Sequence, residues 1–288
     1  MWWRTCSRRC RPARTDPSPD RTFPRPPDVP ELIEVEMYRQ VAAATVGRTI
    51  ATIDAPDAWY LKRGATAAVV TDALVGAVVE RVERHGKVLL VHLDREVVVG
   101  LRFGMTGRLL VDGRGPIAEL LYGSPRNDPA WNRFACGFTD GGTMVVSDPR
   151  RLGGVELNPE IDRLGPDAAT ISTGALRARL RPSRAPLKAA LLDQHRVAGL
   201  GNLLVDETLW RAGLAPTRVA GDLDDAAVRG LAGRIRSTVG LLTRRGGSHT
   251  GDLQVERRRG GRCPRCGMEL RRDVVGTRTT YWCSTDQH

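Results

Sequence analysis

The chain has 288 residues, which is enough for two domains that each bury a core of their own. Apolar residues make up 41% of it and charged residues 27%, and no stretch approaches the roughly 20 apolar residues that span a bilayer, so we expect no membrane partner. The 44 Lys and Arg against 33 Asp and Glu give a net charge of +11, which fits a polyanionic partner.

The first 29 residues differ from the rest of the chain. They contain six prolines and seven arginines and lack the apolar central stretch of a secretory signal. Such a composition cannot bury a core. We therefore expect residues 1–29 to be a disordered or non-native leader.

The predicted elements fall into two groups. Apolar residues recur at helical spacing from 31 to 46, and short strand-like segments follow, at 50–55, 79–84, 88–93, 97–102, 107–112, 134–139 and 143–147. Further helical patterns cover 173–181, 185–194, 201–212 and 222–244. These patterns predict an α+β protein with a helix and a β-sandwich domain over 30–160 and a helical domain over 170–250.

Three cysteines near the C-terminus have metal-ligand spacing. Cys263-Pro-Arg-Cys266 is followed by Cys283, and Asp286 stands where a second CxxC would place a fourth thiolate. Tetrahedral Zn²⁺ accepts thiolate, carboxylate or imidazole, so Asp286 or His288 would complete one structural zinc site. The alternative is a degenerate finger that holds no zinc. Eight arginines between 257 and 278 make the region 256–288 a candidate hairpin for gripping phosphates.

A glycine-rich turn precedes another predicted helix. In Leu191-Leu-Asp-Gln-His-Arg-Val-Ala-Gly-Leu-Gly-Asn202 one helix ends near Gln194 and Asn202 begins the next. A turn of this kind offers backbone N–H groups and a favourable dipole to a phosphate. The alternative is a plain turn between two helices.

Seven motifs occur in order from residue 30 to residue 287. They are Pro30-Glu-Leu-Ile-Glu-Val-Glu36, Arg84-His-Gly-Lys87, Gly104-Met105-Thr-Gly107, Asp148-Pro-Arg-Arg151, the Leu-Asp-Gln…Gly-Leu-Gly-Asn segment, Leu253-Gln-Val and the cysteine finger. Together they resemble the formamidopyrimidine-DNA glycosylase / endonuclease VIII family. The resemblance implies an N-terminal helix with a β-sandwich, then a helix–two-turns–helix domain ending in a zinc-finger β-hairpin.

The resemblance also implies a base-excision repair enzyme with glycosylase and AP lyase activity. The secondary amine of Pro30 would attack C1′ of the damaged nucleoside, and β- then δ-elimination would cut the strand on both sides of the sugar. Glu31 would protonate the deoxyribose ring oxygen, and Glu34 would support the site. Lys87 would bridge the lesion phosphates, and Arg278 would clamp the phosphate beside the flipped nucleotide.

Five further residues are expected to bind DNA. By resemblance Asn202 would hold a phosphate, while Met105, Arg150 and Leu152 would fill the gap that the flipped base leaves. We also place Lys188 in the DNA-binding set. The expected partner is double-stranded DNA with a damaged base, bound by a monomer in the bacterial cytoplasm, at the nucleoid.

Two departures from the family pattern bear on the substrate. Leu152 stands where relatives often have Phe, and only five residues separate Gly247 from Leu253, where relatives that excise 8-oxoguanine carry a long loop. Five residues cannot cap an everted purine. We therefore expect formamidopyrimidines, oxidised pyrimidines or abasic sites to be preferred.

The proposed nucleophile requires Pro30 to be the first residue, because a proline amide inside a chain has no free lone pair. The leader is then removed or never translated, and Val29 fits a GTG codon that initiates with Met, which is cleaved readily before Pro. The alternative is a catalytically silent damaged-DNA or abasic-site-binding protein whose amine the leader blocks. A zinc-finger transcription factor is disfavoured, because no major-groove helix pattern accompanies the single finger.

Overall fold

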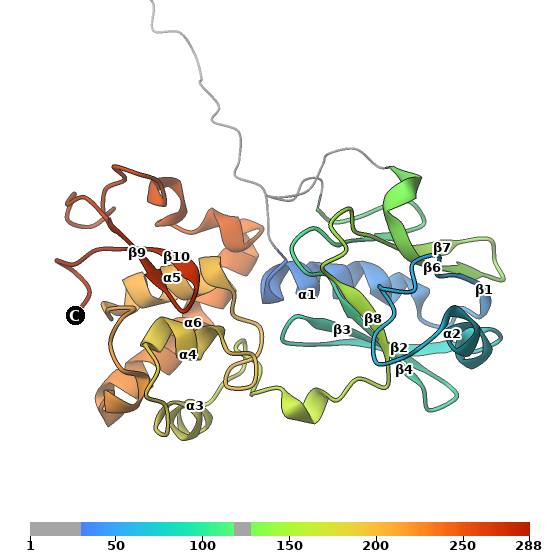
Figure 1. The fold of residues 1–288 in the computed structure, drawn as a ribbon, viewed down its shortest axis with the longest axis horizontal. Coiled ribbons are helices and arrows are strands. Elements are labelled where there is room, and N and C mark those ends of the chain that lie inside the picture. The colour runs from blue at the N-terminus through green and yellow to red at the C-terminus, as the bar shows by residue number, and fades with distance from the viewer. Residues whose placement is uncertain (1–29, 118–127) are drawn as a thin grey trace, which may run out of the picture.

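The computed structural model describes residues 30–117 and 128–288, so the expectation for the leader lies outside the described residues. Figure 1 shows two halves, with the amino-terminal end of α1 (Leu32–Ala42) directed from the sandwich toward the helices of the other half. Among the described residues, no helix is both long and apolar enough to cross a membrane. The predicted α+β fold class is confirmed.

The N-terminal half is a sandwich of two antiparallel four-stranded sheets. One sheet has the order β1 (Ile50–Asp54), β6 (Asn132–Phe138), β7 (Thr143–Ser147), β5 (Arg108–Val111). The other has the order β2 (Val79–His85), β3 (Val88–Leu93), β4 (Val98–Arg102), β8 (Gly154–Leu157). The inner faces and one face of α1 share a core, in which the Tyr38 and Phe103 rings lie 4.4 Å apart between centroids.

Two elements of this half were not expected from the sequence. Helix α2 (Ala67–Leu74) begins at Thr66, whose hydroxyl accepts a hydrogen bond from the Val69 N–H at 3.3 Å. Strand β8 begins with a glycine and has four residues. A strand of this length is too short to show an alternating pattern.

The C-terminal half contains α3 (Thr173–Leu180), α4 (Leu187–Leu192), α5 (Asn202–Ala212) and α6 (Asp225–Arg245) around a second core. Leu32 and Ile33 of α1 belong to this second core. Helix α1 therefore joins both halves, and the residues just before it lie where the halves meet. Short 3₁₀ turns occupy Ala43–Thr45, Pro129–Trp131, Ile161–Arg163, Ala220–Asp222, Ser248–Thr250 and Gln254–Glu256.

The chain ends in the hairpin β9 (Arg271–Val275) and β10 (Arg278–Trp282). Its two-residue turn has Gly276 at φ +56° and Thr277 at φ +65°, the backbone conformation that matches the twist of paired strands. Cys263, Leu270 and Cys283, with Tyr281 beside them, pack the hairpin region against Trp210 of α5. This packing fixes the turn, and with it Arg278, over the start of α5.

Candidate active site and nucleic-acid interface

The carboxylate of Glu31 joins the two halves of the molecule. Glu31 precedes α1, and its oxygens accept hydrogen bonds from the N–H groups of Gly201 (2.8 Å), Leu203 (2.8 Å) and Leu204 (3.1 Å) at the start of α5. The first N–H groups of a helix have no partner within it, so a carboxylate from another segment satisfies them. Burial raises the pKa of Glu31, while the nearby Lys87 and these donors act in the opposite direction.

Glu34 makes a second link, one turn further along α1. One carboxylate oxygen accepts the Glu31 N–H at 2.9 Å, and the other accepts the Ser248 N–H at 2.7 Å. The segment after α6 is therefore attached to the head of α1. Glu34, which the sequence motif suggested as a supporting acid, lies beside Glu31 in the structure.

Lys87 lies in the turn between β2 and β3, beside these carboxylates. Burial lowers the pKa of Lys87, and so does Arg278, whereas Glu31 and Glu34 raise it. Lys87, Arg278 and the two glutamates are therefore close enough to influence one another, although they come from three distant parts of the sequence. Lys87 and Pro30 also line one pocket of about 150 Å³, with Phe103 and Gln194 on its wall.

An ion pair that sequence reasoning missed holds the Lys87 turn. Arg84 donates to Asp167 at 2.5 Å, and the Gly86 N–H donates to the same carboxylate at 2.7 Å. A Cβ at Gly86 would lie 2.7 Å from that of Ala198, so only glycine allows the turn to approach the segment before α5 so closely. Arg84 was visible in its motif, but Asp167 lay 83 positions away without a pattern.

The hairpin turn that carries Arg278 lies over α4 and α5. The Thr279 carbonyl accepts hydrogen bonds from the Asn202 amide at 3.4 Å and the Lys188 ammonium at 3.2 Å. The side chain of Arg278 itself is exposed. Asn202 and Arg278, both expected to bind phosphate, therefore lie at one surface.

Lys188 differs from its expected role. Its side chain is 0% exposed, and its Nζ lies 2.7 Å from Asp206, whose other oxygen lies 2.9 Å from Arg257. A fully buried ammonium has no face to offer a phosphate. The structure gives Lys188 a supporting position under the hairpin in place of the direct DNA contact expected from the sequence.

The three expected gap-filling residues lie on two adjoining loops. A Cβ at Gly104, next to Met105, would lie 2.7 Å from the Cβ of Leu152, so the loops touch. Asp148 braces them: its carboxylate accepts the Thr106 hydroxyl and the N–H groups of Arg150 (3.2 Å) and Gly153 (2.9 Å). Leu152 is 48% exposed, so its apolar side chain is accessible to a partner.

The finger residues converge as the cysteine spacing predicted. One potential ligand atom from each of Cys263, Cys266, Cys283 and Asp286 lies within 4.8 Å of the others. Cys263 and Asp286 are 3.0 Å apart, and Cys266 and Cys283 are 3.4 Å apart, between ligand atoms. Three cysteine side chains and a carboxylate are a donor set that fits a structural zinc ion, and Asp286 takes the fourth place in this cluster instead of the alternative His288.

The site therefore combines a buried acid, a lysine whose pKa is lowered by burial, and a basic hairpin, where a β-sandwich meets a helical domain. These features define a class of DNA-repair enzymes, and the comparisons with known proteins agree. Three family models match: the formamidopyrimidine-DNA glycosylase N-terminal domain over residues 29–155, the H2TH domain over 164–252, and the zinc finger found in FPG and IleRS over 260–288.

Curated relatives match over most of their length. A formamidopyrimidine-DNA glycosylase from Paracoccus denitrificans is 34% identical over 88% of this chain and 98% of its own, and one from Salinispora arenicola is 36% identical over 88% and 95%. The chain belongs to the formamidopyrimidine-DNA glycosylase family. It is accordingly a zinc-finger DNA glycosylase of base-excision repair whose partner is DNA.

A solved structure agrees with this fold. The complex of the Lactococcus lactis Fpg with DNA containing an abasic site aligns with a TM-score of 0.74 at 26% identity, covering 90% of this chain and 99% of that chain. The same Lactococcus protein has been solved with DNA containing FAPY-dG and with DNA containing an oxidized pyrimidine.

Proposed function

We propose that the enzyme is a bifunctional glycosylase and AP lyase whose nucleophile is the amine of Pro30. The observation that carries the proposal is the position of Pro30: it lines a pocket with Lys87 and is followed directly by the buried Glu31. An α-amine has a pKa of about 7.7–8.0, against about 10.4 for lysine, so more of it is neutral and nucleophilic near pH 7.

The proposed reaction starts at this amine. The Pro30 nitrogen forms a bond to C1′ as the glycosidic bond breaks, the base leaves with the bonding electrons, and opening of the sugar ring gives an iminium ion. Loss of a C2′ proton then expels the 3′ phosphate, and a second elimination expels the 5′ phosphate. Lys87 and Arg278 hold the phosphates on either side.

Glu31 is the proton donor to the ring oxygen in this proposal. A buried acid with a raised pKa retains its proton nearer to neutral pH than an exposed one, and this suits general acid catalysis. Its three backbone donors fix the carboxylate in place, so no reorganisation is needed at the moment of transfer.

We propose formamidopyrimidines, oxidised pyrimidines and abasic sites as substrates. The segment that is long in relatives with 8-oxoguanine activity is here a short turn attached at both ends. Glu34 accepts the Ser248 N–H, and Glu207 accepts the N–H groups of Asp252 (3.1 Å) and Leu253 (2.9 Å). This turn is too short, and too firmly attached at both ends, to close over a purine.

The proposal includes a chain that begins at Pro30 and acts as a monomer in the cytoplasm. The family model matches from residue 29, so the leader lies outside the matched domain. The competing function is a silent abasic-site-binding protein with the Pro30 nitrogen held in an amide.

Borohydride reduction on abasic-site DNA distinguishes the two. A chain beginning at Pro30 is expected to give a covalent protein–DNA adduct, and the same chain with its terminal amine acetylated is expected to give none. Binding of abasic-site DNA without an adduct from the Pro30-start chain would support the silent binder.

A further inference from the structure

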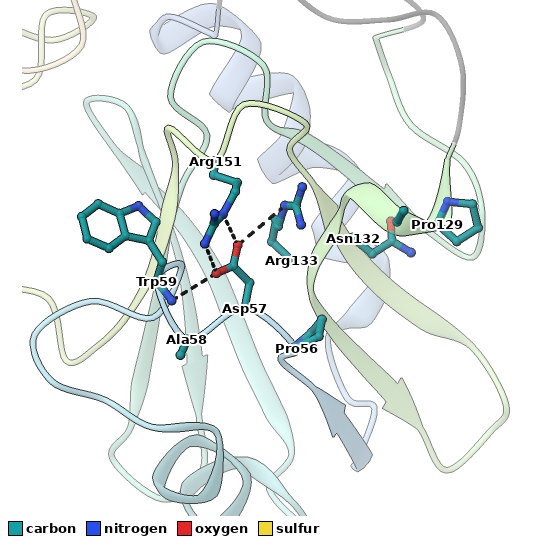
Figure 2. Close-up of a pocket in the computed structure, with 9 residues that line it drawn as sticks. Pro56, Asp57, Ala58, Trp59, Pro129, Asn132, Arg133 and Arg151 are labelled. Atoms are coloured by element: carbon teal, nitrogen blue, oxygen red, sulfur yellow. Dashed lines mark hydrogen bonds and ion pairs between the residues drawn. The ribbon is translucent and has the colours of Figure 1, made fainter.

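A second pocket lies beside the loop that carries Arg150 and Leu152. Its volume is about 800 Å³, and it is open to solvent. Figure 2 shows Trp59 at one end of this pocket and Pro129 at the other, with Asp57, Arg133 and Arg151 between them. The reaction proposed above uses none of these residues.

Asp57 ties the segment 57–62 to the gap-filling loop. Its carboxylate receives two hydrogen bonds from Arg151, of 2.5 and 2.6 Å, and one from the Trp59 N–H at 3.1 Å (Figure 2). The hydrogen bonds from Arg151, set against the cost of burial, hold the pKa of Asp57 below its usual range. Arg151 has φ +57°, so this ion pair secures a backbone conformation that a non-glycine residue rarely adopts.

Backbone hydrogen bonds continue the attachment. The N–H of Val155 donates to the Tyr60 carbonyl at 2.9 Å, and the Lys62 N–H donates to the Val155 carbonyl at 2.9 Å. Segment 57–62 therefore runs along the start of β8, where the chain leaves the loop of Arg150 and Leu152. Its position relative to the gap-filling loop is fixed on both sides of Trp59.

Trp59 is the most exposed tryptophan among the described residues, at 69%. The Lys62 ammonium lies 5.1 Å from the ring centroid, a cation–π contact that adds positive charge beside the indole. An exposed aromatic ring beside a cation is the kind of surface on which proteins stack unpaired bases.

We propose that Trp59 is a DNA-contact residue whose indole stacks on the base left unpaired opposite the lesion. This inference rests on the proposed function, because the unpaired base exists only when a nucleotide is flipped or abasic. Leu152 has no aromatic ring, and Trp59 supplies one from the neighbouring segment. Trp59 thereby affects which opposite bases are accepted.

The test uses a duplex with an abasic analogue opposite 2-aminopurine, whose fluorescence falls when an aromatic ring stacks on it. Binding is measured for the full chain and for the chain beginning at Pro30, each as wild type, Trp59→Ala, Trp59→Phe and the control Val69→Ala. Val69 is also exposed, on α2, and contributes no aromatic ring. Both substituted side chains are at the surface, so equal thermal unfolding is the check on folding.

Trp59→Ala is expected to weaken binding of the abasic duplex about ten-fold and to abolish the quenching, without changing affinity for undamaged duplex. Trp59→Phe is expected to retain much of both, and Val69→Ala all of both. If Trp59→Ala kept wild-type affinity and quenching, the proposed role of Trp59 would be overturned and the proposed function would stand. Failure of both wild-type chains to prefer the abasic duplex would overturn the proposed function and this inference with it.

Discussion

Replacing Glu31 separates its structural role from its chemical one. In Glu31→Ala the N–H groups of Gly201, Leu203 and Leu204 lose their shared acceptor in the interior. An unsatisfied buried donor costs about 1–3 kcal/mol, and water entering the space left by the side chain keeps each near the lower value. We therefore expect a loss of about 3 kcal/mol, a large part of the stability of a typical domain.

Glu31→Gln is expected to behave differently. Its amide oxygen can accept two of the three hydrogen bonds. A neutral amide also avoids the cost of burying a charge, and this cost is what raises the pKa of Glu31. The loss of stability should stay near 1 kcal/mol. Both variants lack the proton donor, so both should lose about 10²- to 10⁴-fold in base excision.

The assays are urea unfolding, amide hydrogen exchange at Gly201, Leu203 and Leu204, and single-turnover excision, all on the chain that begins at Pro30. Glu80→Ala, an exposed acid on β2, is the control and should match the wild type in all three. Unchanged unfolding and exchange in Glu31→Ala would refute the structural role. Wild-type excision by Glu31→Gln would refute the chemical one.

Three further predictions test other parts of the site. Since burial lowers the pKa of Lys87, its charge is lost as pH rises through a value below the usual 10.4, and the proposed phosphate contact is lost with it. We therefore expect kcat/KM to fall there in the wild type and not in Lys87→Arg. In the same pH interval the unfolded chain binds more protons than the folded one, so the contribution of Lys87 to stability should increase with pH. If the wild type and Lys87→Arg had identical kcat/KM profiles, the proposed role of Lys87 would be contradicted. Asp206→Ala leaves the buried Lys188 ammonium without its carboxylate and should lower the free energy of unfolding in urea by about 3–5 kcal/mol. The double variant Lys188→Met/Asp206→Ala should lose less stability. If the losses of the two single variants simply added in the double variant, the pair would not be coupled. Chelation of zinc should abolish binding of abasic-site DNA, and Asp286→Cys should slow zinc release measured with a chromogenic chelator; release faster than from the wild type would exclude Asp286 as a ligand.

Local sequence patterns predicted the parts of the fold that local physics controls. Helical spacing gave α1 and the helices of the C-terminal half, alternation gave seven of the strands of the sandwich, and cysteine spacing gave the finger. The convergence of Glu31, Lys87 and Arg278 followed from the family resemblance alone. Nothing in the spacing of these residues indicates that they meet.

The missed features depend on contacts between distant positions. The pairs Arg84–Asp167 and Arg151–Asp57 join residues 83 and 94 positions apart, and such pairs leave no periodic signal. Lys188 was misassigned for a similar reason, because a lysine at a helix start is usually exposed and its buried partner Asp206 lies on another helix. Tertiary contacts of this kind require the structure.

The most direct test of the central claim is to map the borohydride-trapped adduct to a residue. Abasic-site DNA is reduced with the chain that begins at Pro30, the complex is digested, and the cross-linked peptide is identified by mass spectrometry. The account predicts that the added mass lies on the nitrogen of Pro30 and persists in Lys87→Arg. An adduct on Lys87, or no adduct from a chain that binds the DNA, would contradict it.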